Sequence, residues 1–374
     1  MRKKIAVYHP NLSTFGGGEF VCLSVALALA KDYDVTIFTN YSPGKEKLQN
    51  FFCVNLGQIN IIERRHAISR LPILNSIKPG MILRGVYKML EAYDLVIDTG
   101  TNGWFDKKLN CKTVCYVHFP LFYKKKKGIK KPLNYYLIKP ESAFQYDKII
   151  CNSEFTKNYV SKQTRKPLEI LYPPVNTKGI NPGKKSKRIV TIGRLTYDKK
   201  HEIMIQAFKV FFDENKDYTF HIIGSFQENV RLYDHKYLSM LKQKSEGYPI
   251  EFHINMPHDQ VINFLKNSEI YWHARGFDEL DPHEYENFGI STVEAMAAGC
   301  IPIVINLGAQ TEIVEHKKNG FCWNNPKELV SYTKAAIKNP KLASNLKKNA
   351  LKKSRLYDAE IFQKGIKKII KSLL

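Results

Sequence analysis

The feature that most constrains the fold is an alternation of short apolar runs with helical stretches, which occurs twice along the 374 residues. In the first half, residues 5–8 form an apolar run, residues 19–30 are rich in Ala and Leu, and residues 34–38 are apolar again. These patterns are typical of strand, helix and strand. Strands that alternate with helices favour a parallel sheet covered on both faces. The first half is therefore predicted to be a doubly wound α/β domain.

The same alternation begins again after a polar, Pro-rich segment that contains Tyr172-Pro-Pro and Asn181-Pro-Gly. This segment has the composition of a linker, and a chain of this length is too long for one comfortable core. We expect an N-terminal domain over residues 1–175, a C-terminal domain over residues 176–355, and a basic amphipathic helix over residues 356–374. That helix is expected to cross back to the N-terminal domain.

Further strands are predicted at residues 95–97, 113–117, 148–151, 188–192, 218–223, 250–253, 270–272 and 301–305. Two consecutive doubly wound domains place a ligand cleft between the carboxyl ends of their sheets. The sequence thus predicts an α/β fold with two parallel sheets facing an interdomain cleft.

Composition excludes several classes of protein. With 44% hydrophobic and 12% aromatic residues the chain is globular, and its seven scattered cysteines form no C-x-x-C pair. Most of them lie in or beside apolar runs, which is typical of buried thiols in a reducing compartment and gives no structural zinc site. The N-terminus lacks the pattern of a signal peptide, and no run approaches the ~18–20 apolar residues of a membrane span. We expect a cytoplasmic protein that is peripheral to a membrane at most.

The net charge of +23 calls for an anionic partner, and lysine blocks occur at residues 124–127 and 130–131. Phospholipid, nucleotide phosphates and nucleic acid are all candidates, and a solvated Lys-rich surface is the plainer alternative. No nucleic-acid-binding module is recognisable, and aromatic residues do not alternate with basic ones on a strand, so no nucleic acid is expected.

Two glutamates, Glu286 and Glu294, flank a glycine-containing turn that leads into a helix of small residues. The order places one carboxylate beside a helix N-terminus, where N–H groups and the dipole favour an anionic ligand, and a second one turn into the helix. A pocket that accepts a phosphate and offers two acids suits a sugar nucleotide. The alternative is a capping box, in which Ser291 caps the helix and Glu294 reaches back, with Glu286 a solvated loop acid.

Arg194 and Lys199 directly follow the first strand of the second half, in the sequence Gly193-Arg-Leu-Thr-Tyr-Asp-Lys199. A guanidinium and an ammonium in a loop at the carboxyl edge of a sheet suit a diphosphate, whose charge grows as it leaves. The alternative is two more cations on a basic surface.

The first half offers a glycine loop, Phe15-Gly-Gly-Gly18-Glu19, and a histidine, His118, at the end of the strand over residues 113–117. The glycines allow close approach of the backbone to a ligand, although a plain tight turn explains them equally well. The loop matches neither the dinucleotide-binding nor the P-loop pattern. His118 is a candidate for catalysis or for a structural role, and no histidines have the spacing of a H-E-x-x-H metal site.

In this order the motifs resemble the family-4 retaining glycosyltransferases of GT-B fold. The second half carries G-R-L-x-x-x-K and then E-x-F-G-x-x-x-x-E-A-M-A-x-G-x-x-P-I-V, and the resemblance covers nearly the whole chain. The first half is similar to the α-1,2-mannosyltransferases that extend dolichol-linked oligosaccharide from GDP-mannose. The matching stretches are Gly16-Gly-Gly-Glu19, Cys115-Tyr-Val-His118-Phe-Pro, Cys151-Asn-Ser-Glu-Phe-Thr156 and Tyr172-Pro-Pro174.

The resemblance implies a role for each motif residue. Arg194 and Lys199 would bind the donor's phosphates, Glu294 the ribose hydroxyls and Glu286 the donor sugar. Backbone N–H groups would lie near sugar and phosphate, and His118 would lie close to the transferred sugar. These backbone groups belong to Phe288, Gly289 and Ile290, with Gly17 and Gly18 approaching the phosphates from the first domain. Neither a metal nor a cofactor is implied, because Arg and Lys supply the positive charge.

The chain departs from the family pattern at three places. Lys200 stands where Gly or Asn is common, one flexible glycine is lost at Gly308-Ala309, and the leucine at position 307 is unusual. An acidic segment, residues 277–285, precedes Glu286 and is a candidate for shaping the acceptor or sugar side.

The predicted function is retaining transfer of a hexose, with mannose favoured, from a nucleotide sugar to a glycan or lipid-linked glycan. GDP-mannose is the favoured donor and a UDP-sugar, acting on a different glycan, is the alternative. A non-catalytic nucleotide-sugar-binding partner subunit is a second alternative. The basic amphipathic stretch at residues 70–90 and the aromatics at residues 119–127 predict binding to an anionic membrane surface, with packing on the first domain as the alternative.

Overall fold

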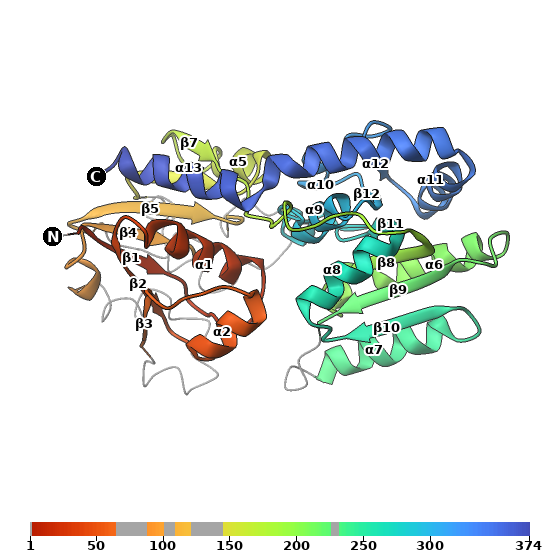
Figure 1. Cartoon of the computed structure of the whole chain (residues 1–374), viewed down its shortest axis with the longest axis horizontal. Coiled ribbons are helices and arrows are strands. Elements are labelled where there is room, and N and C mark those ends of the chain that lie inside the picture. The colour runs from red at the N-terminus through yellow and green to blue at the C-terminus, as the bar shows by residue number, and fades with distance from the viewer. Residues whose placement is uncertain (1, 65–87, 101–108, 121–144, 226–231) are drawn as a thin grey trace. The chain divides into compact units, whose positions relative to one another are not determined.

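The computed structural model describes residues 2–64, 88–100, 109–120, 145–225 and 232–374 (Figure 1). They form two compact units. The N-terminal unit comprises Met1–Pro174 and Ala359–Leu374, and the C-terminal unit comprises Val175–Asp358. The last helix therefore belongs to the same unit as the first strand.

The N-terminal unit is a seven-stranded sheet in the order β3-β2-β1-β4-β5-β6-β7, and every pair of neighbours is parallel. The strands are β1 (Lys4–Tyr8), β2 (Asp34–Thr39), β3 (Asn60–Glu63), β4 (Leu95–Asp98), β5 (Lys112–Val117), β6 (Lys148–Cys151) and β7 (Leu168–Ile170). The helices that the structure describes are α1 (Gly17–Leu29), α2 (Lys45–Phe52), α5 (Glu154–Val160) and α13 (Ala359–Lys371).

Helix α13 packs against α1 and shares one hydrophobic core with β1 and β2. Its buried residues, Phe362, Ile366, Ile369 and Ile370, lie on one face of the helix. A Cβ at Gly365 would lie 2.6 Å from Leu171 Cδ1, so the small residue lets the helix approach the segment after β7 closely. The amphipathic pattern at the end of the chain thus has a partner in the N-terminal unit.

The C-terminal unit is a six-stranded parallel sheet in the order β10-β9-β8-β11-β12-β13. The strands are β8 (Ser186–Ile192), β9 (Thr219–Gly224), β10 (Ile250–Ile254), β11 (Ser268–His273), β12 (Ile301–Ile305) and β13 (Phe321–Trp323). The α-helices are α6 (His201–Phe212), α7 (Leu232–Ser245), α8 (His258–Asn267), α9 (Ile290–Ala297), α10 (Gln310–Ile313), α11 (Pro326–Lys338) and α12 (Pro340–Ser354). The described residues of this unit also form three 3-10 turns, η4 (Tyr197–Lys199), η5 (Pro282–Glu284) and η6 (Arg355–Tyr357).

The doubly wound architecture is confirmed in both units, and the ten predicted strands are all present. Three strands, β3, β7 and β13, were missed. Strands β3 and β7 are only partly buried and lack a continuous apolar run, and β13 has three residues. Each of the three ends a sheet. They add strands at the ends of the sheets, and they are parallel to their neighbours.

The strand order reverses once in each sheet, between β1 and β4 and between β8 and β11. Loops that follow the strands on the two sides of such a point diverge at the carboxyl edge, and ligands bind there. In the C-terminal unit these are the loops after Ile192 and after His273. The structure therefore places the Arg194 and Glu286 motifs at one edge of one sheet.

Within the part of the chain that the structure describes, no helix is long and apolar enough to cross a membrane. Most of the membrane-binding stretches expected at residues 70–90 and 119–127 lie outside the described residues. Of the second stretch, Phe119 is buried and its ring centroid lies 5.5 Å from that of Phe155.

Candidate active site

The loop after β8 brings Lys199 back over the strand end. Gly193 lies directly beneath the lysine, and a Cβ at Gly193 would meet Lys199 Cδ at 3.3 Å. The turn closes at Lys200, whose φ of 55° is left-handed. That conformation favours Gly or Asn, which explains why these residues are common in the family where this chain has a lysine. Lys200 is anchored instead by Glu279, with Nζ 2.6 Å from Oε1.

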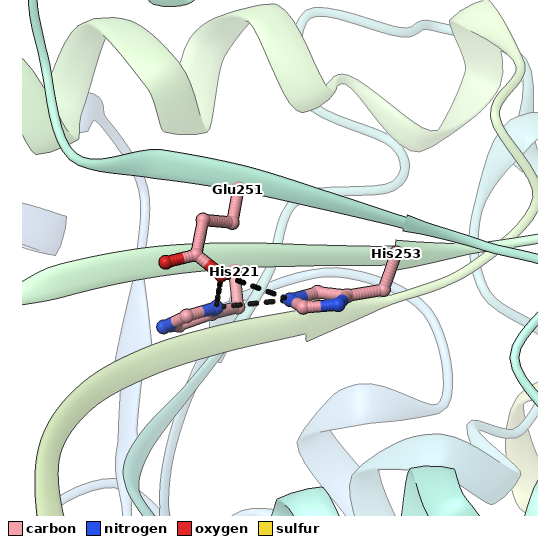
Figure 2. A group of neighbouring side chains, drawn as sticks. All are labelled: His221, Glu251 and His253. Atoms are coloured by element: carbon pink, nitrogen blue, oxygen red, sulfur yellow. Dashed lines mark hydrogen bonds and ion pairs between the residues drawn. The ribbon is translucent and has the colours of Figure 1, made fainter.

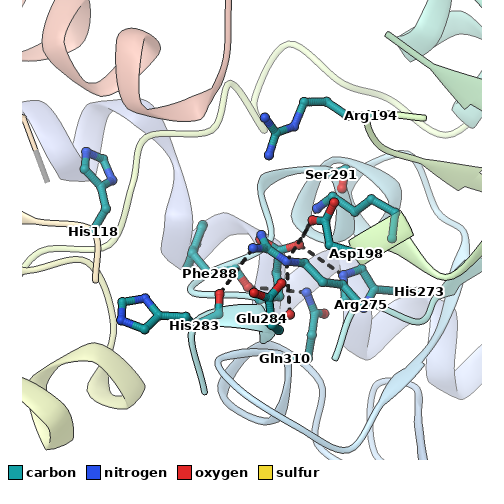
Figure 3. A network of polar contacts seen from close by, with 12 residues as sticks. His118, Arg194, Asp198, His273, Arg275, His283, Glu284, Phe288, Ser291 and Gln310 are labelled. Atoms are coloured by element: carbon teal, nitrogen blue, oxygen red, sulfur yellow. Dashed lines mark hydrogen bonds and ion pairs between the residues drawn. The ribbon is translucent and has the colours of Figure 1, made fainter. Parts of the chain in front are cut away.

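Glu286 is the centre of a charged network, of which His273 and Arg275 are labelled in Figure 3. Its Oε2 lies 2.8 Å from Lys199 Nζ and 3.2 Å from His273 Nε2, and its Oε1 lies 3.5 Å from Arg275 Nη1. Burial alone would raise the pKa of Glu286, but the positive charges of Lys199 and Arg275 outweigh it and hold this pKa well below its usual range. Glu286 is therefore an ionised carboxylate in a site that is largely closed to water.

Arg275 joins this carboxylate to the two loops around it. Its Nε lies 3.3 Å from Asp198 Oδ2 and donates to the carbonyl of Glu284 at 3.2 Å. Its Nη2 donates to the carbonyl of His283 at 3.4 Å. The acidic segment before Glu286 is thus held by its backbone, and its Glu279 side chain pairs with Lys200. These contacts determine where the Glu286 carboxylate points.

The turn between Glu286 and α9 needs a glycine. Gly289 has a φ of 124°, and a Cβ there would lie 2.3 Å from Gln310 Nε2. Gln310 donates to the carbonyl of Phe288 at 3.3 Å and accepts from Thr292 Oγ1 at 3.0 Å. Gly289 is the N-cap of α9, and the structure shows no side-chain cap for this helix among the described residues. The first N–H groups of α9 are therefore available to an anion.

The capping box that Ser291 and Glu294 suggested does not form. The helix begins one residue before Ser291, whose Oγ lies 2.9 Å from the hydroxyl of Tyr271. Glu294 Oε1 lies 2.8 Å from His258 Nε2. Burial raises the pKa of Glu294 to about 8, so this carboxyl is largely neutral at pH 7. The side chain of Glu294 therefore does not cap α9, the helix on which it lies.

Arg194 differs from the other cations of the site. It is exposed, and its guanidinium has no hydrogen bond or ion pair with any described residue. Its backbone carbonyl accepts from Thr196 N at 2.9 Å, which anchors the loop but leaves the side chain uncommitted. The charge of Arg194 is therefore available to a ligand.

In the N-terminal unit the side chain of Glu19 forms hydrogen bonds with the glycine loop that precedes it. Glu19 Oε2 accepts from Gly16 N at 2.7 Å, and Thr14 Oγ1 donates to Oε1. His9 Nε2 lies 3.5 Å from Glu19 Oε1. Burial would raise the pKa of Glu19, but the contact with His9 and the other hydrogen bonds lower it to about 2. Glu19 is an ionised cap of the loop.

His118 lies at the end of β5 with its Nε2 buried and without a hydrogen-bond partner in the described part of the chain. Burial, and then the proximity of His9, lower the pKa of His118 to about 4, so the imidazole is neutral at pH 7. Gly18 lies against both histidines, because a Cβ there would meet His9 Cε1 at 3.5 Å and His118 Nε2 at 3.6 Å. Gly17 and Gly18 open α1.

The structure thus joins Lys199 with Glu286, and Gly18 with His118. It places Gly289, Ile290 and Glu294 on one short helix. Sequence reasoning missed other members of these groups. For His9, His273 and Arg275 the signal was available, because each ends or follows a strand, β1 for His9 and β11 for the other two. His258 and Gln310 had no comparable signal, since their contacts come from elements distant in the sequence.

Comparison with known proteins identifies two domain families in the chain. The model of glycosyltransferase family 4 matches residues 15–178, and the model of the glycosyl transferases group 1 matches residues 175–353. Together they run from the glycine loop to the last turn of α12, and they meet at the boundary between the two units.

Similar curated proteins include an uncharacterised glycosyltransferase from Haemophilus influenzae, 28% identical, with 98% of each chain covered. The GDP-Man:Man(3)GlcNAc(2)-PP-Dol α-1,2-mannosyltransferase of Dictyostelium discoideum is 22% identical, with 99% of this chain and 85% of that protein covered. The human enzyme of the same name is 25% identical, with coverage of 81% and 72%.

Two solved structures share the fold. Anabaena HepE, in complex with UDP and glucose, has a TM-score of 0.73 at 16% identity, with 99% of this chain and 100% of that chain covered. The sucrose-phosphate synthase of Thermosynechococcus elongatus has a TM-score of 0.79 at 15% identity, with 100% and 99% covered. The chain therefore belongs to the glycosyltransferases that join a family 4 domain to a group 1 domain, and it has their GT-B fold.

Proposed function

We propose that this glycosyltransferase moves a hexose, with mannose favoured, from a nucleotide-diphosphate sugar to a hydroxyl of a glycan or lipid-linked glycan, with retention of the anomeric configuration. One observation carries this proposal. The uncommitted cation Arg194 and the uncapped N-terminus of α9 lie in the same unit as the ionised carboxylate Glu286, in loops at one edge of its sheet.

The phosphate end of the donor is assigned to Arg194 and Lys199. Two cations stabilise the charge that develops on a departing diphosphate, and they require no bound metal. Lys199 is held in position by Glu286, whereas Arg194 is unpaired among the described residues. The N–H groups at the start of α9, from Phe288 to Ile290, are assigned to the phosphate and the sugar.

Glu286 is assigned to the hydroxyls of the transferred sugar. An ionised carboxylate with both oxygens fixed by cations remains a strong hydrogen-bond acceptor in a fixed direction. In the proposed reaction the acceptor hydroxyl attacks the anomeric carbon on the face that the diphosphate leaves. The C–O bond to the diphosphate breaks, and a diphosphate oxygen takes the proton of the attacking hydroxyl. No protein nucleophile is required.

The N-terminal unit is assigned to the reacting end of the donor. Neutral His118, with Nε2 free to accept or donate, suits a hydroxyl of the transferred sugar. Gly17 and Gly18 are assigned to the phosphates, because glycine lets a ligand approach the backbone. Glu294 is assigned to the ribose hydroxyls, where its neutral carboxyl can both donate and accept.

Relatives and structural neighbours favour different donor bases. The names of the mannosyltransferase relatives specify GDP-mannose, whereas the HepE structures contain UDP, UDP-glucose or UDP with glucose. We favour GDP-mannose because those relatives match over most of this chain. A UDP-sugar-dependent transfer to another glycan is the second candidate.

Thermal unfolding in the presence of GDP, UDP and their sugars tests this assignment. Binding to the folded state raises the unfolding temperature, and the rise grows with the logarithm of the ratio of ligand concentration to Kd. GDP-mannose is expected to give the largest shift, which Arg194→Ala should abolish. A larger shift with a UDP-sugar would reverse the choice of donor, and no shift with any nucleotide sugar would contradict the proposal.

The acceptor is proposed to be presented at an anionic membrane surface, to which the chain binds peripherally. The proposal rests on the net charge of +23 and on the basic amphipathic stretch at residues 70–90. Flotation with anionic liposomes at low salt should carry the protein upward, and high salt should release it. Failure to float with anionic vesicles at low salt would end this part of the proposal.

A further inference from the structure

A cluster of potential metal ligands lies on β10 and β9, the two strands at one end of the C-terminal sheet. The cluster lies within the strands and not in the loops that follow them. His221 is on β9, and Glu251 and His253 are on β10 (Figure 2). Glu251 is paired in register with His221, and His253 is two residues farther along the same strand. Since side chains alternate along a strand, Glu251 and His253 share one face of the sheet.

The donor atoms have the spacing of a tetrahedral site. His221 Nδ1 lies 3.0 Å from His253 Nε2, and Glu251 Oε2 lies 3.5 Å and 3.7 Å from these two nitrogens. Zinc bonds of about 2.0–2.1 Å to nitrogen, arranged tetrahedrally, separate neighbouring ligand atoms by about 3.3 Å. A single ion can therefore reach all three atoms with only small side-chain movements.

The outer contacts of His221 are those of a metal-binding histidine. Its second nitrogen, Nε2, lies 2.8 Å from Thr219 Oγ1. When Nε2–H donates to Thr219, the lone pair of Nδ1 points at Glu251 and His253, which is how ligating imidazoles are commonly oriented. His221 is 3% exposed and His253 half-buried, and both rings pack on Phe264 of α8, with centroids 4.8 Å and 4.9 Å from it.

One cation lies close to the cluster. Arg188 stacks on Phe264, with its guanidinium carbon 5.1 Å from the ring centroid. The Glu251 side chain is 59% exposed and supplies the negative charge that favours a cation. The exposure of Glu251 leaves room for a water as the fourth ligand.

We propose that His221, Glu251 and His253 form a binding site for a divalent transition metal, with Zn²⁺ the best match. Two imidazoles, one carboxylate and an open position are a common zinc ligand set. The ion would tie β10, at the end of the sheet, to β9. This role is structural and does not depend on the proposed transfer reaction.

Equilibrium dialysis of the full chain against Zn²⁺, after removal of metal with a chelator, tests the site. One tightly bound ion per chain is expected, together with a rise in unfolding temperature. His221→Asn and His253→Asn should each weaken binding at least tenfold, and Glu251→Gln should weaken it as well. Binding of Co²⁺ should give the intense visible absorption of a tetrahedral complex.

Two control variants exclude other zinc ligands. His235→Asn removes an exposed imidazole from α7 in the same unit, and Cys53→Ser removes an exposed thiol, so neither should alter the tight site. Because His221 is buried, circular dichroism must show that each variant is folded, and the exposed Glu251→Gln provides the reading if the His221 variant is not. Absence of a tight site, or undiminished binding by folded His253→Asn and Glu251→Gln variants, would overturn the proposal.

Discussion

The glycine loop of the N-terminal unit and the Glu286 region of the C-terminal unit both place an ionised glutamate at the carboxyl edge of a parallel sheet. Their partners differ. Glu19 is bound by Gly16 and Thr14 of its own loop and by His9. Glu286 is bound by Lys199, His273 and Arg275, which come from the loop after β8 and from the end of β11.

The difference separates a local cap from a site assembled by the tertiary fold. Glu19 stabilises one turn, and its removal should be felt mainly as lost stability. Glu286 fixes the direction of two cations, and they in turn fix its own oxygens. An acid next to glycines in the sequence therefore has a different role depending on whether its partners are local or distant.

The largest effect is expected for Glu286→Gln. Loss of one preorganised charged group at a reaction centre costs about 10²–10³ in rate, so transfer should fall by at least that factor. The amide keeps the size of the side chain, and circular dichroism should show a folded protein. Initial rates of nucleotide release, measured for both proteins, check this prediction.

A matched control is Glu269→Gln, because Glu269 also pairs with a lysine, Lys347, at 3.1 Å, outside the candidate site. It should retain transfer near the wild-type rate. Glu19→Gln should act chiefly on stability. If Glu286→Gln were as active as the wild type, the role assigned to Glu286 would be wrong.

Two substitutions in one loop, Arg194→Ala and Lys199→Ala, should have similar effects on donor binding and different effects on stability. Each should lower kcat/KM by about 10²-fold or more, because each removes one cation from the departing diphosphate. Only Lys199→Ala should also lower the free energy of unfolding, since it leaves Glu286 without one of its partners, whereas Arg194 is exposed. Urea unfolding beside kinetics distinguishes the two. Equal loss of stability in both variants would contradict the contrast.

Glycine substitutions sharpen the comparison between the two regions. Gly289→Ala should cost about 1–3 kcal/mol of stability, because φ is 124° and the new Cβ would clash with Gln310. Gly18 lies in α1, and a Cβ added there would be 3.5 Å or more from its neighbours. Gly18→Ala should therefore raise the free energy of unfolding by about 0.5–1 kcal/mol, while it weakens donor binding. Donor affinity unaffected by Gly18→Ala would remove the role proposed for the glycine loop.

Acid titration should affect the two groups of the N-terminal unit in different pH ranges. His118 has a folded-state pKa near 4, below its ordinary value of 6.5. Its contribution to the free energy of unfolding is therefore full above pH 6.5 and is lost as pH falls toward 4. Glu19 has a pKa near 2 in place of 4.5, so its contribution is lost only below about pH 4.5.

The midpoint of urea unfolding measured from pH 7 to pH 2.5 checks both ranges. His118→Asn should flatten the decline between pH 6.5 and 4, and Glu19→Gln should flatten it below pH 4.5. A His118 variant with the same decline as the wild type between pH 6.5 and 4 would show that this histidine is not buried and neutral.

The smallest effect is expected for Glu294→Gln. The amide can still donate and accept, so the KM for the donor should rise only severalfold, with little change in kcat. Because the buried carboxyl has a pKa near 8, its unfavourable ionisation lowers stability as pH rises from 4.5 through 8. The glutamine variant should lack this decline. Glu294→Ala, which removes both functions, should raise KM further.

Much of the fold was predictable from the sequence because buried parallel strands are continuous apolar runs, as at residues 301–305. The loop residues Arg194, Lys199 and Glu286 could be placed at strand ends by the same reasoning. The partners of these residues could not be predicted. The contact of His258 with Glu294 spans 36 residues, and that of Gln310 with Thr292 depends on how α9 and α10 pack. Such contacts follow from tertiary packing, which spacing along the chain does not encode.

The most direct test of the central claim is transfer itself. The full chain is incubated with GDP-mannose and a mannose-terminated lipid-linked acceptor, and the anomeric configuration of the product is determined by NMR. The account predicts release of GDP together with an α-mannoside, and loss of both in Glu286→Gln. A β-linked product, or no nucleoside diphosphate released from any GDP- or UDP-sugar by the folded wild-type protein, would contradict it.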